Sequence, residues 1–120
     1  MKITIETIPH DQQRYSTCGD WQIGVRGDIT IRVSETGNWR YEAAVAVHEL
    51  VEALLCWNDR ISTDEVDAFD MAYTGDDEPG DDPDAPYARQ HCFATAVERL
   101  LIAAFGVSWA GYEAAVEALS

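Results

Sequence analysis

The chain has few basic residues. Eight lysines and arginines stand against 22 aspartates and glutamates, which gives a formal net charge of −14. Because nucleic-acid backbones are polyanionic, this balance argues against nucleic acid as a partner. The acidity is concentrated between Asp59 and Asp84, where 11 acidic residues are opposed only by Arg60. We therefore expect one strongly acidic region rather than a uniformly acidic surface.

Long apolar runs and paired cysteines are also missing. No run of 18 apolar residues is present, so we expect no membrane span and no membrane partner. The first residues alternate apolar and polar side chains, without the apolar stretch of a signal peptide. Three cysteines (Cys18, Cys56 and Cys92) form an odd set without CxxC spacing. This usage indicates reduced thiols and a cytoplasmic protein.

With 120 residues, 47% of them hydrophobic, the chain can bury one core, and we predict a single domain over residues 1–120. Alternation predicts a half-buried strand over 2–8 and a hairpin formed by 21–25 and 29–33 that turns at Gly27. Helices are predicted over 41–57, capped by Asn38 or Thr36, over 62–73 after a capping box, over 85–105 with Gly106 as the stop, and over 108–119. Residues 74–85 form an acidic surface loop, solvated or acting as a lid. Strands followed by three to four helices predict an α+β fold with a small antiparallel or mixed sheet.

The first helix carries the most informative residues. Residues 43–57 are apolar on nearly every side, and the only polar members are His48, Glu49 and Glu52. Buried carboxylates need compensation from a metal, an arginine or hydrogen bonds. His48 and Glu52 lie four residues apart, so their side chains project from one face and can bind one ion.

The segment His48-Glu49-Leu50-Val51-Glu52 resembles the HExxH motif of the zincin metallopeptidases, with Glu52 in place of the second histidine. The layout of residues 20–100 is also similar, because strands precede the motif helix and His91 lies on a later helix. The resemblance implies a zincin-like α+β fold and a metal-dependent, peptidase-like hydrolase acting on a peptide or protein. It further implies that strand 28–34 is the edge strand along which an extended substrate aligns. The chain also looks like small proteins encoded by phages and prophages, a likeness that implies no activity.

On chemical grounds His48, Glu52 and His91 form a two-histidine, one-carboxylate set that suits zinc with one open position. Glu49 is then the expected general base, and Tyr87 a candidate donor to a developing oxyanion. Glu98, seven residues after His91, is predicted to orient a ligand or to be a fourth one. The same donor set suits iron.

Three alternatives remain open. His48 could be a core histidine bonded to a backbone carbonyl, with Glu49 and Glu52 paired to Arg89 or Arg99. The acidic pairs of the helices at 49–52 and 64–70 resemble MazG-like nucleotide pyrophosphohydrolases, which bind magnesium through carboxylates alone. The chain could also be a non-enzymatic acidic module that binds a basic partner.

Overall fold

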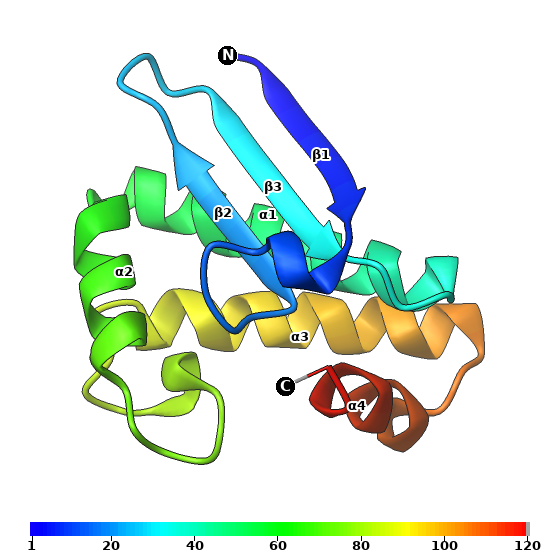
Figure 1. The fold of residues 1–120 in the computed structure, drawn as a ribbon. Helices are drawn as coiled ribbons and strands as arrows, with labels where there is room; N and C mark the ends of the chain where they lie inside the picture. The colour runs from blue at the N-terminus through cyan, green and yellow to red at the C-terminus, as the bar shows by residue number, and fades with distance from the viewer. Residues whose placement is uncertain (120) are drawn as a thin grey trace.

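A computed structural model describes residues 1–119 and shows an α+β fold, as the sequence predicts. Three strands come first: β1 (Ile3–Ile8), β2 (Gly19–Ile23) and β3 (Ile29–Ser34), with the short 3-10 turn η1 (His10–Gln12) after β1. They form one mixed sheet in the order β1-β3-β2 (Figure 1). Four α-helices follow, together with a second 3-10 turn, η2 (Pro79–Asp81).

The hairpin prediction is confirmed. β2 and β3 pair antiparallel, with Trp21 opposite Ile31. The turn between them contains Gly27 at φ 80°, a left-handed conformation that glycine adopts without strain. This pairing brings the start of β2 towards the first helix, where it lines the pocket described below.

Two predictions about the strands are wrong. β1 is not half-buried: five of its six residues are exposed, including Ile3 and Ile5, because helix α1 (Trp39–Asn58) contacts mainly β2 and β3. β3 is not an edge strand, because β1 pairs with it in parallel along one side and β2 pairs along the other. An extended substrate therefore cannot pair with β3.

The helices are α1, α2 (Thr63–Ala72), α3 (Ala88–Phe105) and α4 (Trp109–Glu117). The Asn38 side chain caps α1 by accepting a hydrogen bond from the amide of Arg40. The capping box of Ser62 and Glu65 opens α2. α3 starts three residues later than predicted, because Ala85 to Tyr87 form a turn ahead of it. Gly106 ends α3 at φ 73°, as expected.

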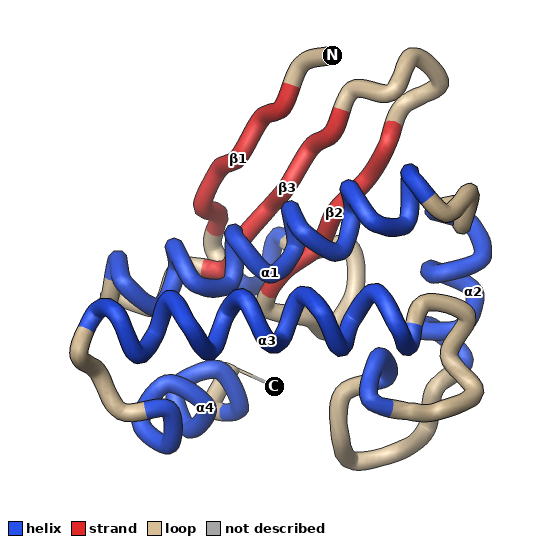
Figure 2. The backbone as a smooth tube through the Cα atoms, turned by 180° about the vertical axis from the view of Figure 1, so that it is seen from behind, coloured by secondary structure: helices blue, strands red, loops and turns tan. Residues whose placement is uncertain are grey.

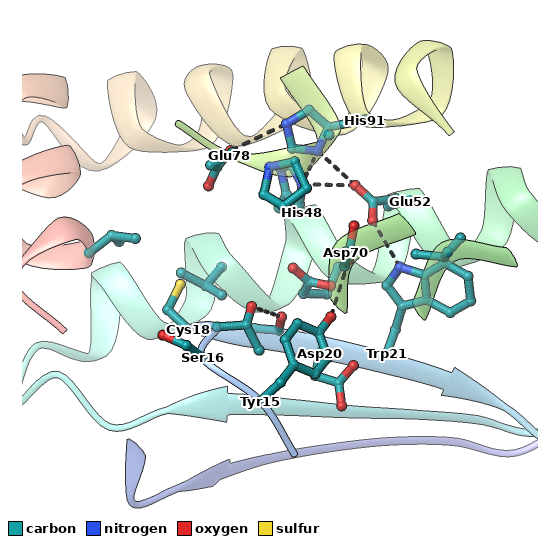
Figure 3. Close-up of a pocket in the computed structure, with 18 of the residues that line it drawn as sticks. Tyr15, Ser16, Cys18, Asp20, Trp21, His48, Glu52, Asp70, Glu78 and His91 are labelled. Carbon is teal, nitrogen blue, oxygen red and sulfur yellow. Dashed lines mark hydrogen bonds and ion pairs between the residues drawn. The ribbon is translucent and has the colours of Figure 1, made fainter. Parts of the chain in front are cut away.

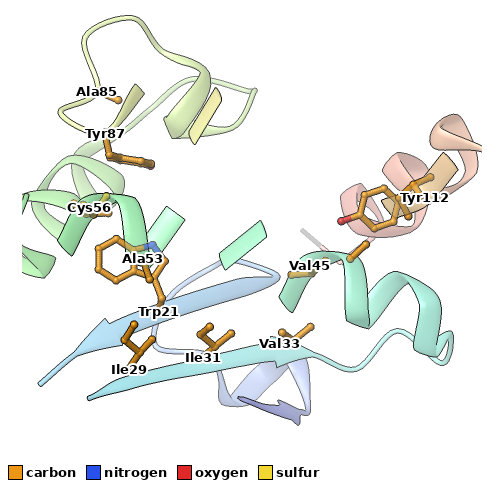
Figure 4. Packing of buried hydrophobic residues seen from close by; sticks show 13 residues of the cluster. Trp21, Ile29, Ile31, Val33, Val45, Ala53, Cys56, Ala85, Tyr87 and Tyr112 are labelled. Carbon is orange, nitrogen blue, oxygen red and sulfur yellow. The ribbon is translucent and has the colours of Figure 1, made fainter. Parts of the chain in front are cut away.

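The core lies between the sheet and α1. Ile29, Ile31 and Val33 project from β3 towards α1, where Val45 and Ala53 meet them (Figure 4). α3 runs antiparallel beside α1, with α2 near the start of α3 and α4 near its end (Figures 1 and 2). Among the described residues no single helix is long and apolar enough to cross a membrane; α3 and α4 reach that measure only as a pair bent by 119°.

The predicted acidic loop is only partly a solvated segment. Its η2 turn packs against α3, and Gly80 is buried. A Cβ atom at Gly80 would lie 2.5 Å from two atoms of the His91 ring, so the glycine permits the backbone to cover that ring. The loop is therefore a wall of the site on α1 and α3.

Candidate metal centre

Helices α1 and α3 bring His48, Glu52 and His91 together in a buried group, which we call the ligand triad. The three residues are 7%, 5% and 5% exposed, respectively. His48 Nε2 lies 3.2 Å from Glu52 Oε2 and 3.2 Å from His91 Nδ1, and His91 Nδ1 lies 2.9 Å from Glu52 Oε2 (Figure 3). These three atoms form a compact triangle that could hold a metal ion.

The dimensions of the triangle fit a tetrahedral metal. Zinc bonds nitrogen and carboxylate oxygen at about 2.0–2.2 Å, so two ligand atoms of a tetrahedral site lie about 3.3 Å apart. The observed separations of 2.9–3.2 Å are close to that value. The triad therefore needs only small shifts to accept an ion.

The remaining polar atoms of the triad face outer partners. Glu98 Oε1 lies 2.8 Å from His48 Nδ1, and the Tyr112 hydroxyl donates a hydrogen bond to the other Glu98 oxygen. The indole N–H of Trp21 donates to Glu52 Oε1 at 2.9 Å. Carboxylate partners of this kind hold an imidazole in the tautomer whose free lone pair faces a metal.

On the outer side of His91, Nε2 lies 3.3 Å from Glu78 Oε2 and 3.1 Å from Asp81 Oδ1. These are ion-pair distances without the alignment of a hydrogen bond. Glu78, Asp81 and His91 make a second group whose ligand atoms lie within 4.8 Å of one another, but both carboxylates are exposed. We interpret Glu78 and Asp81 as carboxylates that hold a proton on His91 Nε2. The lone pair of Nδ1 then points towards His48 and Glu52.

Protons hold the triad together when no metal is bound. Burial alone lowers the pKa of His48, but hydrogen bonds with Glu52 and Glu98 outweigh it and raise that pKa well above its usual value. Burial likewise lowers the pKa of His91, and the contacts with Glu52 and Glu78 raise it to about 10. Burial raises the pKa of Glu52, whereas the two imidazoles lower it to about 2.

Glu49, the predicted general base, points into the same pocket but bonds to none of the triad in the described structure. It packs against β2 at Gly19, where a Cβ atom would lie 2.8 Å from Glu49 Cγ and Oε1. Burial raises the pKa of Glu49 well above its ordinary value, and the charge of Glu52 adds to the rise. A buried carboxylate whose pKa is raised, and which lines a pocket, is a candidate for proton transfer.

The pocket at the triad has a volume of about 280 Å³. Tyr87 lines it, but its hydroxyl donates to Asp70 rather than to the triad. Asp70 also accepts a hydrogen bond from the Tyr15 hydroxyl at 3.2 Å. The oxyanion role of Tyr87 therefore stays a prediction, and it would require the Tyr87 hydroxyl to leave Asp70.

Several contacts differ from the alternatives drawn from the sequence. Arg89 lies near Asp59 and Arg99 over Trp109, so neither arginine pairs with the carboxylates of α1. Of the acidic pairs in the magnesium alternative, Asp67 pairs with Arg14. Within residues 1–119, the groups that could hold a metal include none of Glu49, Asp64, Asp67 and Asp70. The geometry thus favours a mixed histidine and carboxylate site.

Sequence reasoning missed Trp21, Tyr112 and Glu78 as partners of the triad. Trp21 and Tyr112 fit the pattern of core aromatics, and Glu78 stands in a loop whose composition indicates solvent. A buried indole or phenol does need an acceptor, which is the one signal that could have linked these aromatics to buried carboxylates. Which carboxylate each would reach depends on the packing of β2 and α4 against the helices.

Comparisons of the chain with protein-family models, with curated proteins and with solved structures find no match. The zincin resemblance therefore has the support of the chain's own residues only. What the structure adds to that resemblance is the buried triad within an α+β fold.

Proposed function

We propose that the protein is a metal-dependent hydrolase, peptidase-like in its reaction, with zinc held by His48, Glu52 and His91. The observation that carries the proposal is that three ligand atoms, one from each triad residue, lie within 3.2 Å of one another. The second polar atoms of His48 and Glu52 contact Glu98 and Trp21 instead. One hydrogen bond satisfies two atoms, whereas one divalent cation satisfies all three lone pairs at once.

The donor set supports zinc over magnesium. Imidazole nitrogen suits zinc and iron, whereas magnesium prefers carboxylate and water oxygen. Three protein ligands leave a tetrahedral ion one open position, which is the arrangement of catalytic rather than structural zinc sites. A bound ion of this type lowers the pKa of water and polarises a carbonyl group. Iron, which accepts the same ligands, is distinguished by metal analysis.

The protein's own groups have separate tasks in this proposal. Glu49, which lines the pocket beside the triad, accepts the proton of the attacking water and passes it to the leaving amine. Glu98 and Trp21 keep His48 and Glu52 in the orientation that meets the ion. A peptide substrate is the choice that the zincin resemblance favours.

The test separates ligands from the base. Glu49→Gln keeps the size of the side chain, so we expect full zinc binding and a loss of at least about 100-fold in peptide hydrolysis. His48→Ala should lose both zinc and activity. Glu35→Gln, an exposed change outside the pocket, is the matched control and should alter neither.

Hydrolysis is measured on a mixed peptide pool by mass spectrometry, and zinc by elemental analysis of untagged protein. Zinc loss in Glu49→Gln equal to that in His48→Ala would show that Glu49 is a ligand. A zinc-loaded wild-type protein that cleaves no peptide would overturn the peptidase assignment, and a protein that binds no zinc would show that the triad is a buried proton-held network.

A further inference from the structure

The pocket beside the triad is acidic on nearly every wall. Its carboxylates come mainly from β2, α1, α2 and the acidic loop, and they include Asp20, Glu49, Asp67, Asp70, Asp77 and Glu78. Among residues 1–119 no lysine or arginine lines it. A bound divalent ion offsets only part of this charge, so the pocket attracts positive groups and repels negative ones.

Two carboxylates of the pocket already share one basic partner. Arg14 donates to Asp20 at 2.7 Å and to Asp67 at 3.0 Å. Asp70, one turn of α2 after Asp67, has no basic partner among the described residues and accepts hydrogen bonds from the Tyr15 and Tyr87 hydroxyls. Each oxygen of the Asp70 carboxylate is thus held by a tyrosine hydroxyl, but no basic side chain in the described part of the chain balances its charge.

The environment of Asp70 is suited to a cation. Figure 3 places Asp70 near Glu52 and Trp21, beside the pocket that holds the triad. Burial raises the pKa of Asp70 to about 6, although the tyrosine hydroxyls act in the opposite direction. Aromatic rings from Tyr15, Trp21 and Tyr87 line the same pocket, and aromatic faces attract ammonium and guanidinium groups.

We infer that the substrate is a peptide carrying a positive charge beside the scissile bond, and that Asp70, held by Tyr15 and Tyr87, binds that charge. This inference rests on the proposed peptidase function for the scissile bond, whereas the cation subsite itself is a matter of binding alone. The positive group is either the ammonium of a peptide's N-terminus or the side chain of lysine or arginine. A neutral peptide leaves Asp70 unpaired, and an acidic peptide is in addition repelled by the carboxylates of the pocket.

The experiment measures peptide binding to Glu49→Gln protein, which holds a substrate without cleaving it, both with and without added zinc. The probes are pairs of short peptides that differ only by lysine or glutamine, each with a free or an acetylated N-terminus. We expect at least about tenfold tighter binding of the charged member. The acetylated lysine peptide and the free-ended glutamine peptide separate the side chain from the terminus as the source of the charge.

Asp70→Asn in the same background removes the charge and keeps an acceptor for one of the two tyrosine hydroxyls, and it should abolish the preference. Asp64→Asn, the same change at an exposed position of α2 that does not line this pocket, is the matched control and should keep it. Equal binding of charged and neutral peptides overturns the inference, as does a preference lost equally in Asp64→Asn. A preference found without any cleavage by the wild-type protein supports the cation subsite while refuting the peptidase, so the two failures are distinguishable.

Discussion

Replacing His91 by alanine tests how α3 contributes to the site. His91 is 5% exposed and contacts Glu52, His48 and the η2 turn. Truncating a buried side chain of this size costs about 2–5 kcal/mol. Leaving the buried Glu52 oxygen with one partner fewer adds about 1–3 kcal/mol. We therefore expect His91→Ala to destabilise the metal-free protein by at least about 3 kcal/mol.

For a domain of this length, about 1 kcal/mol shifts Tm by roughly 4 °C, so thermal denaturation should show a drop of at least about 10 °C. Zinc affinity should fall by at least about 100-fold, because two ligands hold zinc poorly. Both quantities are measured on one preparation, by circular dichroism and by competition with a chelating dye. His10→Ala is the control, since His10 bonds to Ser34 and does not line the site. Zinc affinity in His91→Ala within about threefold of wild type would refute the two-helix site.

Three further outcomes follow from the same contacts. Trp21→Phe removes the indole donor to Glu52 and should lower zinc affinity by about tenfold in a chelator competition, with little change in hydrophobic burial; an unchanged affinity would show that this bond does not orient Glu52. Gly80→Ala introduces a methyl group against the His91 ring and should weaken zinc binding or lower Tm by several degrees; a variant that equals wild type in both would show that the loop is free to move. In the metal-free protein the pKa of His91 is raised to about 10, so the protonated imidazole stabilises the fold fully below about pH 6.5, and this stabilisation is lost as the pH rises towards 10. Zinc competes with the protons of the triad and therefore binds more tightly as the pH rises. The rise in Tm on adding zinc should therefore grow between pH 6 and pH 9, and a pH-independent rise would contradict the proton-held triad.

Local features of the chain could be read from its sequence because they depend on neighbouring residues. The capping box at Ser62, the turn at Gly27 and the one-face spacing of His48 and Glu52 need no knowledge of tertiary packing. The approach of His91 to His48 and Glu52 was also predictable in outline, since a helix and a loop suffice to return the chain antiparallel to α1. Periodicity thus accounts for the fold class, and periodicity together with ligand chemistry accounts for the composition of the triad.

The outer contacts of the site depend on packing that no local pattern describes. Glu78 reaches His91 only because Gly80 permits the loop to cover the ring, and a Gly- and Asp-rich segment otherwise indicates solvent. The prediction that β1 is half-buried was wrong for a related reason. Alternation shows which side chains share a face of the strand, but not whether a helix covers that face. β3 became central because β1 pairs with it in parallel, a long-range contact that the sequence does not specify.

The central claim is that the lone pairs of His48, Glu52 and His91 meet on one metal ion. The most direct measurement is a calorimetric titration of untagged, metal-free protein with zinc, repeated on Glu52→Gln, in which the side chain keeps its size but loses its charge. We predict one equivalent of zinc per chain in the wild type and a loss of at least about 100-fold in affinity in the variant. No binding in the wild type, or equal binding in both proteins, would contradict the account.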